Sequence, residues 1–175
     1  MYHKLINEKM KRTGIFYGSS TGNTEVVAEK IKILLGKDAE TINIDTASKE
    51  DIENFDYLIF GTSTWGIGDM QDDWEDFVDV LKEVDFGKTK VALFGLGDQV
   101  NYAESFVDGM GAIYDAIYDR VTIVGEWPRD GYIFKESAAV KNGKFVGLAL
   151  DKENQQELSD ERIKEWVGIL KKEFV

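Results

Sequence analysis

The chain has 175 residues, no cysteine and one histidine, and its 33 acidic and 21 basic side chains give a net charge of -12. The lack of cysteine excludes disulfides, thiol catalysis and iron–sulfur ligation, and His3 alone cannot supply a catalytic triad or a zinc site built on histidine and cysteine. We therefore predict no metal site and expect any redox chemistry to come from a bound cofactor.

The acidic composition and the hydropathy limit the partners and the location. A negative net charge repels nucleic acid and anionic membranes and favours basic partners, although it also simply keeps a protein soluble. No apolar run approaches the roughly 20 residues that cross a bilayer, and the N-terminus has no signal-peptide core. We expect a cytoplasmic monomer with one domain at residues 12–175, preceded by an extension of unassigned role at residues 1–11.

The first part of the chain alternates strand and helix patterns. Strands are predicted at residues 13–18, 40–44 and 57–63, the last an apolar run suited to a strand covered on both faces. Ser48 is a candidate N-cap for a turn or short helix. Gly36 is placed to end a helix whose apolar stripe consists of Val27, Ile31, Leu34 and Leu35.

The alternation continues to the C-terminus. Further strands are predicted at residues 90–97, 121–125 and 144–150, and a final helix is expected to begin at Ser159 as N-cap, with Leu158 and Ile163 as a hydrophobic staple. The inward face of that helix comprises Ile163, Trp166, Val167 and Leu170. Two earlier helices are marked by the stripes Trp74, Phe77, Val78 and Leu81, and Phe106, Met110, Ile113, Tyr114 and Ile117.

This alternation predicts an α/β fold with one doubly wound parallel sheet and helices on both faces, because parallel neighbours require right-handed crossovers. Five strands in a chain of this length suit a small domain of this kind. Ligands bind such sheets beyond the carboxyl ends of the strands. The loops at those ends are therefore the place to look for a site.

The loop after the first strand joins small polar side chains to the start of a helix, where free N–H groups and the helix dipole favour an anion. It matches neither the Walker A nor the Rossmann glycine pattern and contains no basic residue. Neutral donors alone suit a permanently bound monophosphate better than a triphosphate with magnesium. A capped turn explains one or two of the polar residues, but there are five: Ser19, Ser20, Thr21, Asn23 and Thr24.

Two further loops at strand ends carry aromatic residues. Trp65, in TSTWGIGDM, has glycine and polar neighbours that explain it poorly as a core residue. Tyr102 ends the loop GLGDQVNY, where Gly95 and Gly97 permit tight turns or a close approach to a ligand. Two aromatics beside a phosphate loop describe a slot for a flat ring joined to a monophosphate, which is the shape of flavin mononucleotide (FMN).

The three loops, FYGSSTGNTEVVA, TSTWGIGDMQDDWEDF and FGLGDQVNYAESFVDG, resemble in this order those of the flavodoxin family. The resemblance runs from about Arg12 to the C-terminus and implies bound FMN and a five-stranded sheet of order 2-1-3-4-5. The stretch DGYIFKESAAVKNGKFVGLALD is similar to the insertion of the long-chain subgroup. It would interrupt the last strand at about residues 126–144.

The resemblance also implies roles for individual residues. Trp65 would cover the inner face of the flavin ring and Tyr102 the outer face. The phosphate would be bound by Ser19, Ser20, Thr21, Gly22, Asn23 and Thr24. The ring edge and ribityl chain would contact Thr64, Gly66, Gly95, Leu96, Gly97, Asp98 and Gln99, with Asp151 as a further ribityl contact.

A member of this family would be a low-potential one-electron carrier, not an enzyme. It would shuttle electrons between a flavodoxin reductase or similar donor and acceptor enzymes, all with basic surfaces. An acidic run beside the Trp65 loop either steers these partners or complements the dipole of its own helix. The run comprises Asp69, Asp72, Asp73, Glu75, Asp76 and Asp79.

Two alternatives share this fold. One is an FMN-dependent NAD(P)H:quinone oxidoreductase, for which the sequence offers no evident nicotinamide site. The other is a phosphoacceptor receiver domain, which requires an acidic pair after the first strand and an aspartate after the third. The chain has Gly18 and Ser19 in the first place and residues 61–64 without an aspartate in the second.

Overall fold

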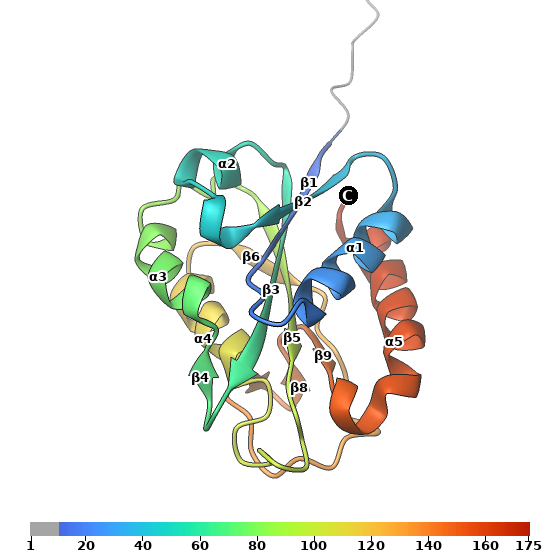
Figure 1. The fold of residues 1–175 in the computed structure, drawn as a ribbon. Coiled ribbons are helices and arrows are strands. Elements are labelled where there is room, and N and C mark those ends of the chain that lie inside the picture. Colours follow the sequence, from blue (N-terminus) through green and yellow to red (C-terminus); the bar gives the residue numbers. More distant parts are fainter. Residues whose placement is uncertain (1–10) are drawn as a thin grey trace, which may run out of the picture.

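The computed structural model describes residues 11–175, in which strands and helices alternate (Figure 1). His3 and residues 1–10 of the predicted extension lie outside the described residues. The first half of the chain forms β1 (Thr13–Tyr17), α1 (Asn23–Leu35), β2 (Ala39–Asn43), the 3-10 turn η1 (Ile44–Thr46), α2 (Lys49–Glu53), β3 (Tyr57–Trp65), β4 (Asp69–Met70) and α3 (Asp72–Leu81). The second half forms β5 (Lys90–Leu96), α4 (Asp108–Ile117), β6 (Thr122–Val124), β7 (Val140–Lys141), β8 (Lys144–Phe145), β9 (Leu148–Leu150) and α5 (Lys152–Glu173).

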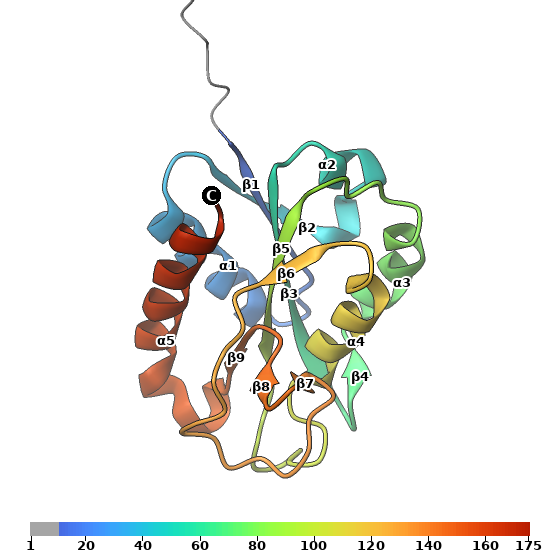
Figure 2. The same cartoon turned by 180° about the vertical axis from the view of Figure 1, so that it is seen from behind.

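The parallel sheet has the order β2-β1-β3-β5, and the last position is shared by β6 and β9. β6 pairs with β5 at residues 90–92, and β9 pairs with β5 at residues 94–96. Figures 1 and 2 show α1 and α5 on one face of the sheet and α3 and α4 on the other. The predicted doubly wound fold, its strand order and its interrupted last strand are therefore confirmed.

The insertion in the last strand spans residues 125–147, between β6 and β9, and includes the antiparallel hairpin of β7 and β8. The strand predicted at residues 144–150 is accordingly two strands with different partners. Gly147 lies between them, where an added Cβ would stand 2.0 Å from the carbonyl oxygen of Leu93 on β5. This close backbone approach lets the chain leave the hairpin and rejoin the sheet.

Two predicted helix starts are wrong. The last helix begins at Lys152, because Asp151 caps it by accepting a hydrogen bond of 3.1 Å from the N–H of Asn154, so that Ser159 lies inside the helix. Phe106 precedes α4, whose N-cap is Val107 with φ 51°. The inward face predicted for the last helix is buried, and Ser48 caps α2 with a capping box as expected.

The core lies on both faces of β1, β3 and β5, whose central residues are inaccessible to solvent. On the α3 side, the ring of Phe60 meets those of Phe16 and Trp74 edge to face. Burying such large aromatic groups supplies much of the hydrophobic stabilisation of a domain. No helix within residues 11–175 combines the length and apolar character needed to cross a bilayer. The three loops that the sequence indicates as a binding site lie at the ends of these packed, rigid strands.

Candidate functional site

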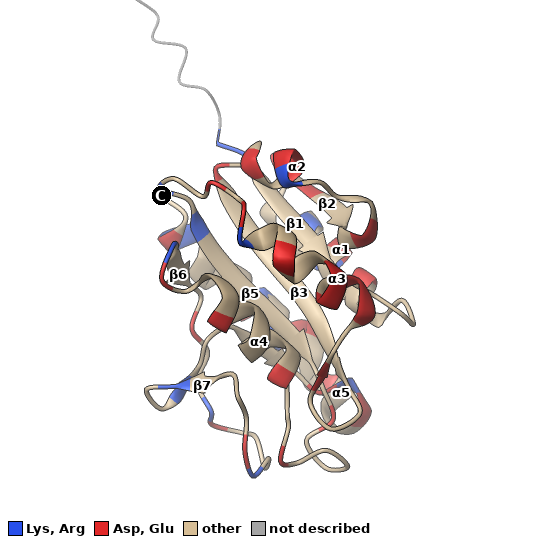
Figure 3. Cartoon of the chain, turned by 90° about the vertical axis from the view of Figure 1, so that its left-hand side faces the viewer, with Lys and Arg blue, Asp and Glu red and all other residues tan. Residues whose placement is uncertain are grey.

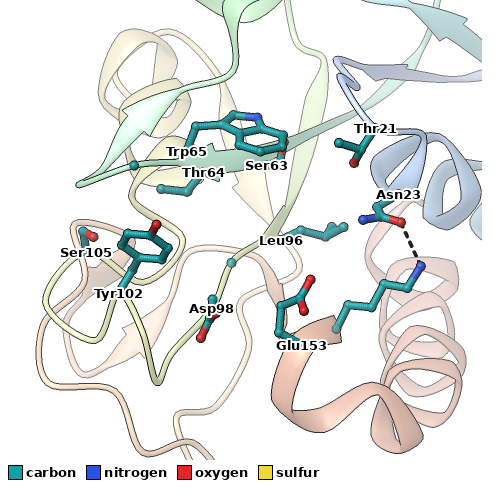
Figure 4. A pocket seen from close by; sticks show the side chains of 13 residues that line it. Thr21, Asn23, Ser63, Thr64, Trp65, Leu96, Asp98, Tyr102, Ser105 and Glu153 are labelled. Carbon is teal, nitrogen blue, oxygen red and sulfur yellow. Dashed lines mark hydrogen bonds between the residues drawn. The ribbon is translucent and has the colours of Figure 1, made fainter.

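A pocket of about 240 Å³ opens at the carboxyl ends of β1, β3 and β5, where the three predicted loops converge (Figure 4). In Figure 4, Thr21 and Asn23 lie on the opposite side of the pocket from Tyr102. Nine predicted site residues line it, namely Thr21, Asn23, Thr64, Trp65, Gly66, Leu96, Gly97, Asp98 and Tyr102. Four lining residues were not predicted, namely Ser63, Ser105, Lys152 and Glu153.

The loop at residues 19–22 leads into α1 without a side-chain cap. Gly22 occupies the N-cap position with φ 89°, and its N–H donates a hydrogen bond of 3.0 Å to Ser19 Oγ. Within the described chain, no side chain accepts from the first-turn N–H groups of α1. An uncapped helix start leaves donors that favour an anion. The loop geometry therefore fits the monophosphate that the sequence suggests.

Gln71, the N-cap residue of α3, contacts this loop through its side-chain amide. Its Nε2 donates 3.3 Å to Ser20 Oγ, and its Oε1 accepts from the N–H of Trp74 at 3.3 Å. A Cβ on Gly18 would lie only 2.1 Å from Gln71 Oε1, so the first strand ends in direct contact with this amide. The loop at residues 19–22 and the start of the acidic helix α3 are thus held together.

Trp65 lies at the end of β3 and not in a loop, because β3 extends two residues beyond its predicted end and turns back as β4. Cross-strand pairing of Trp65 with Asp69 closes this hairpin. Gly66 has φ 50°, a left-handed conformation that glycine adopts without steric cost. The indole remains 40% exposed at the pocket. An aromatic ring held this way on a strand end offers a rigid, partly open stacking surface.

The loop with Tyr102 is organised by the carboxylate of Asp98. Asp98 Oδ1 accepts hydrogen bonds from the N–H groups of Val100 and Asn101 at 3.0 and 2.9 Å, and from Asn154 Nδ2 at 2.8 Å. Partial burial raises the pKa of Asp98, but these hydrogen bonds and a second one from the Asn101 amide outweigh it and hold that pKa below 3.8. The loop is therefore tied to α5 by a charged group.

The insertion supports the other side of the same loop. The N–H of Ile133 donates 2.6 Å to Gln99 Oε1, and the N–H groups of Lys135 and Glu136 donate to Ala103 O at 2.7 and 3.0 Å. These bonds flank Tyr102, whose side chain is 45% exposed. The insertion, for which the sequence suggested no role, thus positions the loop that carries the second aromatic ring.

Several predicted site residues have structural partners and do not line the pocket. Asp151 is fully buried, and its carboxylate accepts from the N–H of Gln99 at 3.2 Å while it caps α5. A Cβ on Gly95 would lie 2.9 Å from Met110 Cβ, so Gly95 lets α4 pack on the sheet. Their contacts with a cofactor stay predictions, as do those of Ser19, Ser20, Gly22, Thr24 and Gln99.

Lys152 alters the electrostatic interpretation of the phosphate loop. Its Nζ donates 2.8 Å to Asn23 Oδ1, so a cation lies against a loop that contains no basic residue of its own. The loop itself therefore contains only neutral donors, as expected, but the assembled pocket adds a basic side chain beside it. The two residues are 129 positions apart, and only the packing of α5 against α1 brings them together.

Comparisons with known proteins agree with this geometry. The family model described as Flavodoxin matches residues 15–166. The chain is 48% identical over 166 residues to a flavodoxin of Nostoc sp., which covers 94% of this chain and 98% of the relative. It is 49% identical over 168 residues to Flavodoxin 1 of Escherichia coli, covering 94% and 96%. Its fold is similar to the crystal structure of a Fusobacterium nucleatum flavodoxin bound to flavin mononucleotide, with a TM-score of 0.90, 40% identity, and coverage of 95% and 100%.

Proposed function

The chain belongs to the flavodoxin family, and we propose that the pocket at the carboxyl ends of β1, β3 and β5 is the place where it binds FMN. The protein is an FMN-binding electron carrier and not an enzyme with a substrate of its own. Bound FMN supplies the one-electron chemistry, and the protein supplies binding, orientation and charge. We therefore assign the binding and the orientation of FMN to individual residues of this chain.

The donor set of the pocket supports phosphate binding at the loop of residues 19–24. The uncapped start of α1 directs N–H groups outward, and the hydroxyls of Ser20 and Thr21 add further donors. Thr24 is buried at this helix start. We assign the phosphate contacts to Ser19, Ser20, Thr21, Gly22, Asn23 and Thr24.

The single observation that carries the proposal is that Trp65 and Tyr102, both partly exposed, line one pocket with this loop. Two aromatic side chains, one at a strand end and one in a loop, suit a flat ring stacked between them. Gly66, with φ 50°, follows Trp65, and a glycine can adopt the backbone conformations that a change in the direction of its carbonyl group requires. We assign ring-edge and ribityl contacts to Thr64, Gly66, Leu96, Gly97, Asp98 and Gln99.

Titration of the full-length apoprotein with FMN tests this assignment. We expect one FMN per chain in the wild type, and weaker FMN binding in Trp65→Ala and Tyr102→Ala by about ten-fold or more, since stacking on an aromatic ring contributes on the order of 1 kcal/mol beyond area burial. Tyr118→Ala is the control, because Tyr118 is 53% exposed, does not line the pocket and follows α4 as its C-cap. Unchanged FMN affinity in both pocket variants would refute the assignment of the ring site.

We further propose that the redox partners are basic proteins, a flavodoxin reductase or similar donor and an acceptor enzyme, and that they meet the monomer beside Trp65. The net charge of -12 and the exposed carboxylates of Asp72 and Glu75 next to the indole support this orientation. Figure 3 shows acidic residues along α3, close to the hairpin that carries Trp65. We propose a cytoplasmic location for the protein as well.

A further inference from the structure

Lys152 places an ammonium group at the junction of the phosphate loop and α5. Its side chain is half-buried, lines the pocket together with Thr21, and donates its hydrogen bond to Asn23 Oδ1 (Figure 4). An ammonium group has three N–H donors, so this contact leaves two for other acceptors. Asn23 is the first residue of α1, and the ammonium therefore lies beside the uncapped helix start.

Local stability does not account for a lysine at this position. Lys152 is the first residue of α5, where a positive charge is unfavourable because it faces the positive end of the helix dipole. Within residues 11–175 it forms no ion pair, and its hydrogen-bond acceptor is a neutral amide. Glu153 lines the pocket too, but its carboxylate does not pair with this ammonium. The charge therefore has no counterion among residues 11–175.

We infer that Lys152 supplies the counterion for the phosphate of bound FMN, with the Asn23 side chain holding the ammonium in position. This inference rests on the proposed function, since it concerns the same pocket. The uncapped start of α1, the loop donors and one cation would then act on one dianion. A paired phosphate also places less negative potential on the flavin ring than a phosphate bound by neutral donors alone.

The test compares FMN with riboflavin, which lacks the phosphate. Dissociation constants of both are measured calorimetrically for the full-length apoprotein of the wild type, Lys152→Gln and Lys152→Arg. We expect Lys152→Gln to weaken FMN binding by about ten-fold, the effect of one charge-assisted hydrogen bond, and to leave riboflavin binding unchanged. Lys152→Arg should retain most of the preference for FMN. Lys164→Gln, an equal charge change on an exposed position of α5, is the control.

The salt dependence of FMN binding is a second readout. A phosphate–ammonium pair is screened by salt, so the difference in FMN affinity between the wild type and Lys152→Gln should shrink as the ionic strength rises. Equal FMN affinity in the wild type and Lys152→Gln would overturn the inference. An equal loss of FMN and riboflavin affinity in Lys152→Gln would also overturn it, because such a loss would show a structural role only. Failure of the wild type to bind FMN would instead refute the proposed function.

Discussion

At the scale of single residues, Gly22 shows how a backbone conformation prepares the anion site. Its φ of 89° turns the chain into α1 while leaving the helix start uncapped, and nothing lies within 4 Å of the place where a Cβ would be. The position therefore requires glycine because of its left-handed backbone conformation, and not because a side chain would lack space. A second glycine, Gly168 in α5, also has open space around it but lies in a regular helix.

Alanine should consequently have opposite effects at these two positions. Gly22→Ala forces a left-handed alanine, and we expect it to lower the free energy of unfolding by about 1 kcal/mol. Gly168→Ala should raise it by about 0.5–1 kcal/mol, because alanine favours helix interiors over glycine. Urea unfolding of the apoproteins measures both. A Gly22→Ala variant as stable as the wild type would show that the loop tolerates another backbone conformation.

Asp98 makes the stability of the Tyr102 loop depend on pH. Its hydrogen bonds outweigh partial burial and hold the pKa of its carboxyl below 3.8, so the folded state favours the charged form more than the unfolded state does. This stabilisation is present above the unfolded pKa and is lost as the pH falls through the lower folded pKa. We expect Asp98→Asn to be less stable than the wild type at pH 7, with the difference shrinking below about pH 4.

Urea unfolding between pH 7 and pH 3 measures this difference. Asp119→Asn is the control, since Asp119 is exposed and accepts no hydrogen bond among the described residues. A stability difference between Asp98→Asn and the wild type that stays constant over this range would contradict the prediction.

At the scale of elements, the insertion is stabilised by the side chain of Tyr132. Its hydroxyl donates 2.5 Å to Ala149 O on β9 and accepts from Trp127 Nε1 at 2.9 Å. Burial raises the pKa of Tyr132 to about 12, although the charge of Arg162 and the bond from Trp127 act in the opposite direction. The insertion is thereby joined to the strand that completes the sheet.

Removing this hydroxyl should therefore destabilise the domain. Tyr132→Phe leaves the indole N–H of Trp127, which is 6% exposed, without its acceptor, and we expect a loss of about 1–3 kcal/mol in the free energy of unfolding.

The raised pKa of Tyr132 also makes the stability of the domain depend on pH. The stabilisation that comes from this pKa is present below the unfolded pKa of about 10 and is lost as the pH rises towards 12. Chemical unfolding at pH 8 and pH 11 tests this, with exposed Tyr118→Phe as control. Equal stability of Tyr132→Phe and wild type at pH 8 would contradict it.

The elements also show what the sequence could predict. Apolar runs and helical stripes located the strands and helices because burial imposes their periodicity, and the strand order followed from the family resemblance. The first turns of α5 escaped prediction because their side chains are largely exposed and the buried stripe begins only at Ile163. Nine predicted residues line the pocket because each lies at or shortly after the carboxyl end of a strand. Lys152 also follows a strand, β9, but its contact with Asn23 depends on the packing of α5 against α1, which the sequence pattern does not record.

At the scale of the whole molecule, negative charge is distributed unevenly around the pocket. Helix α3 has Asp72, Asp73 and Glu75 in its first turn, where the helix dipole stabilises them, so their presence alone does not establish a docking role. Asp76 lies beyond that turn and is exposed. Asp79 pairs with Lys82 at 2.8 Å, which reduces its availability to a partner. Among the carboxylates of α3, Asp72, Glu75 and Asp76 are therefore the exposed ones that can steer a partner.

Neutralising these three residues tests steering against a purely structural role. We expect Asp72→Asn/Glu75→Gln/Asp76→Asn to slow electron transfer to a small basic cytochrome by about ten-fold at low ionic strength, because complementary charges increase the rate of encounter. The difference from the wild type should largely disappear at high salt, where surface charges are screened. Stopped-flow absorbance of the cytochrome measures these rates with the holoprotein.

A matched variant on α5 separates local charge from net charge. Glu157→Gln/Glu161→Gln/Glu165→Gln removes the same number of negative charges from exposed positions on the opposite face of the sheet. Because screening limits electrostatic interactions to about 10 Å at 0.1 M salt, charges beside Trp65 should matter more than equal charges elsewhere. If the two triple variants slow electron transfer equally, the effect comes from net charge. If the α3 variant does not slow electron transfer, the carboxylates of α3 only complement the dipole of their own helix.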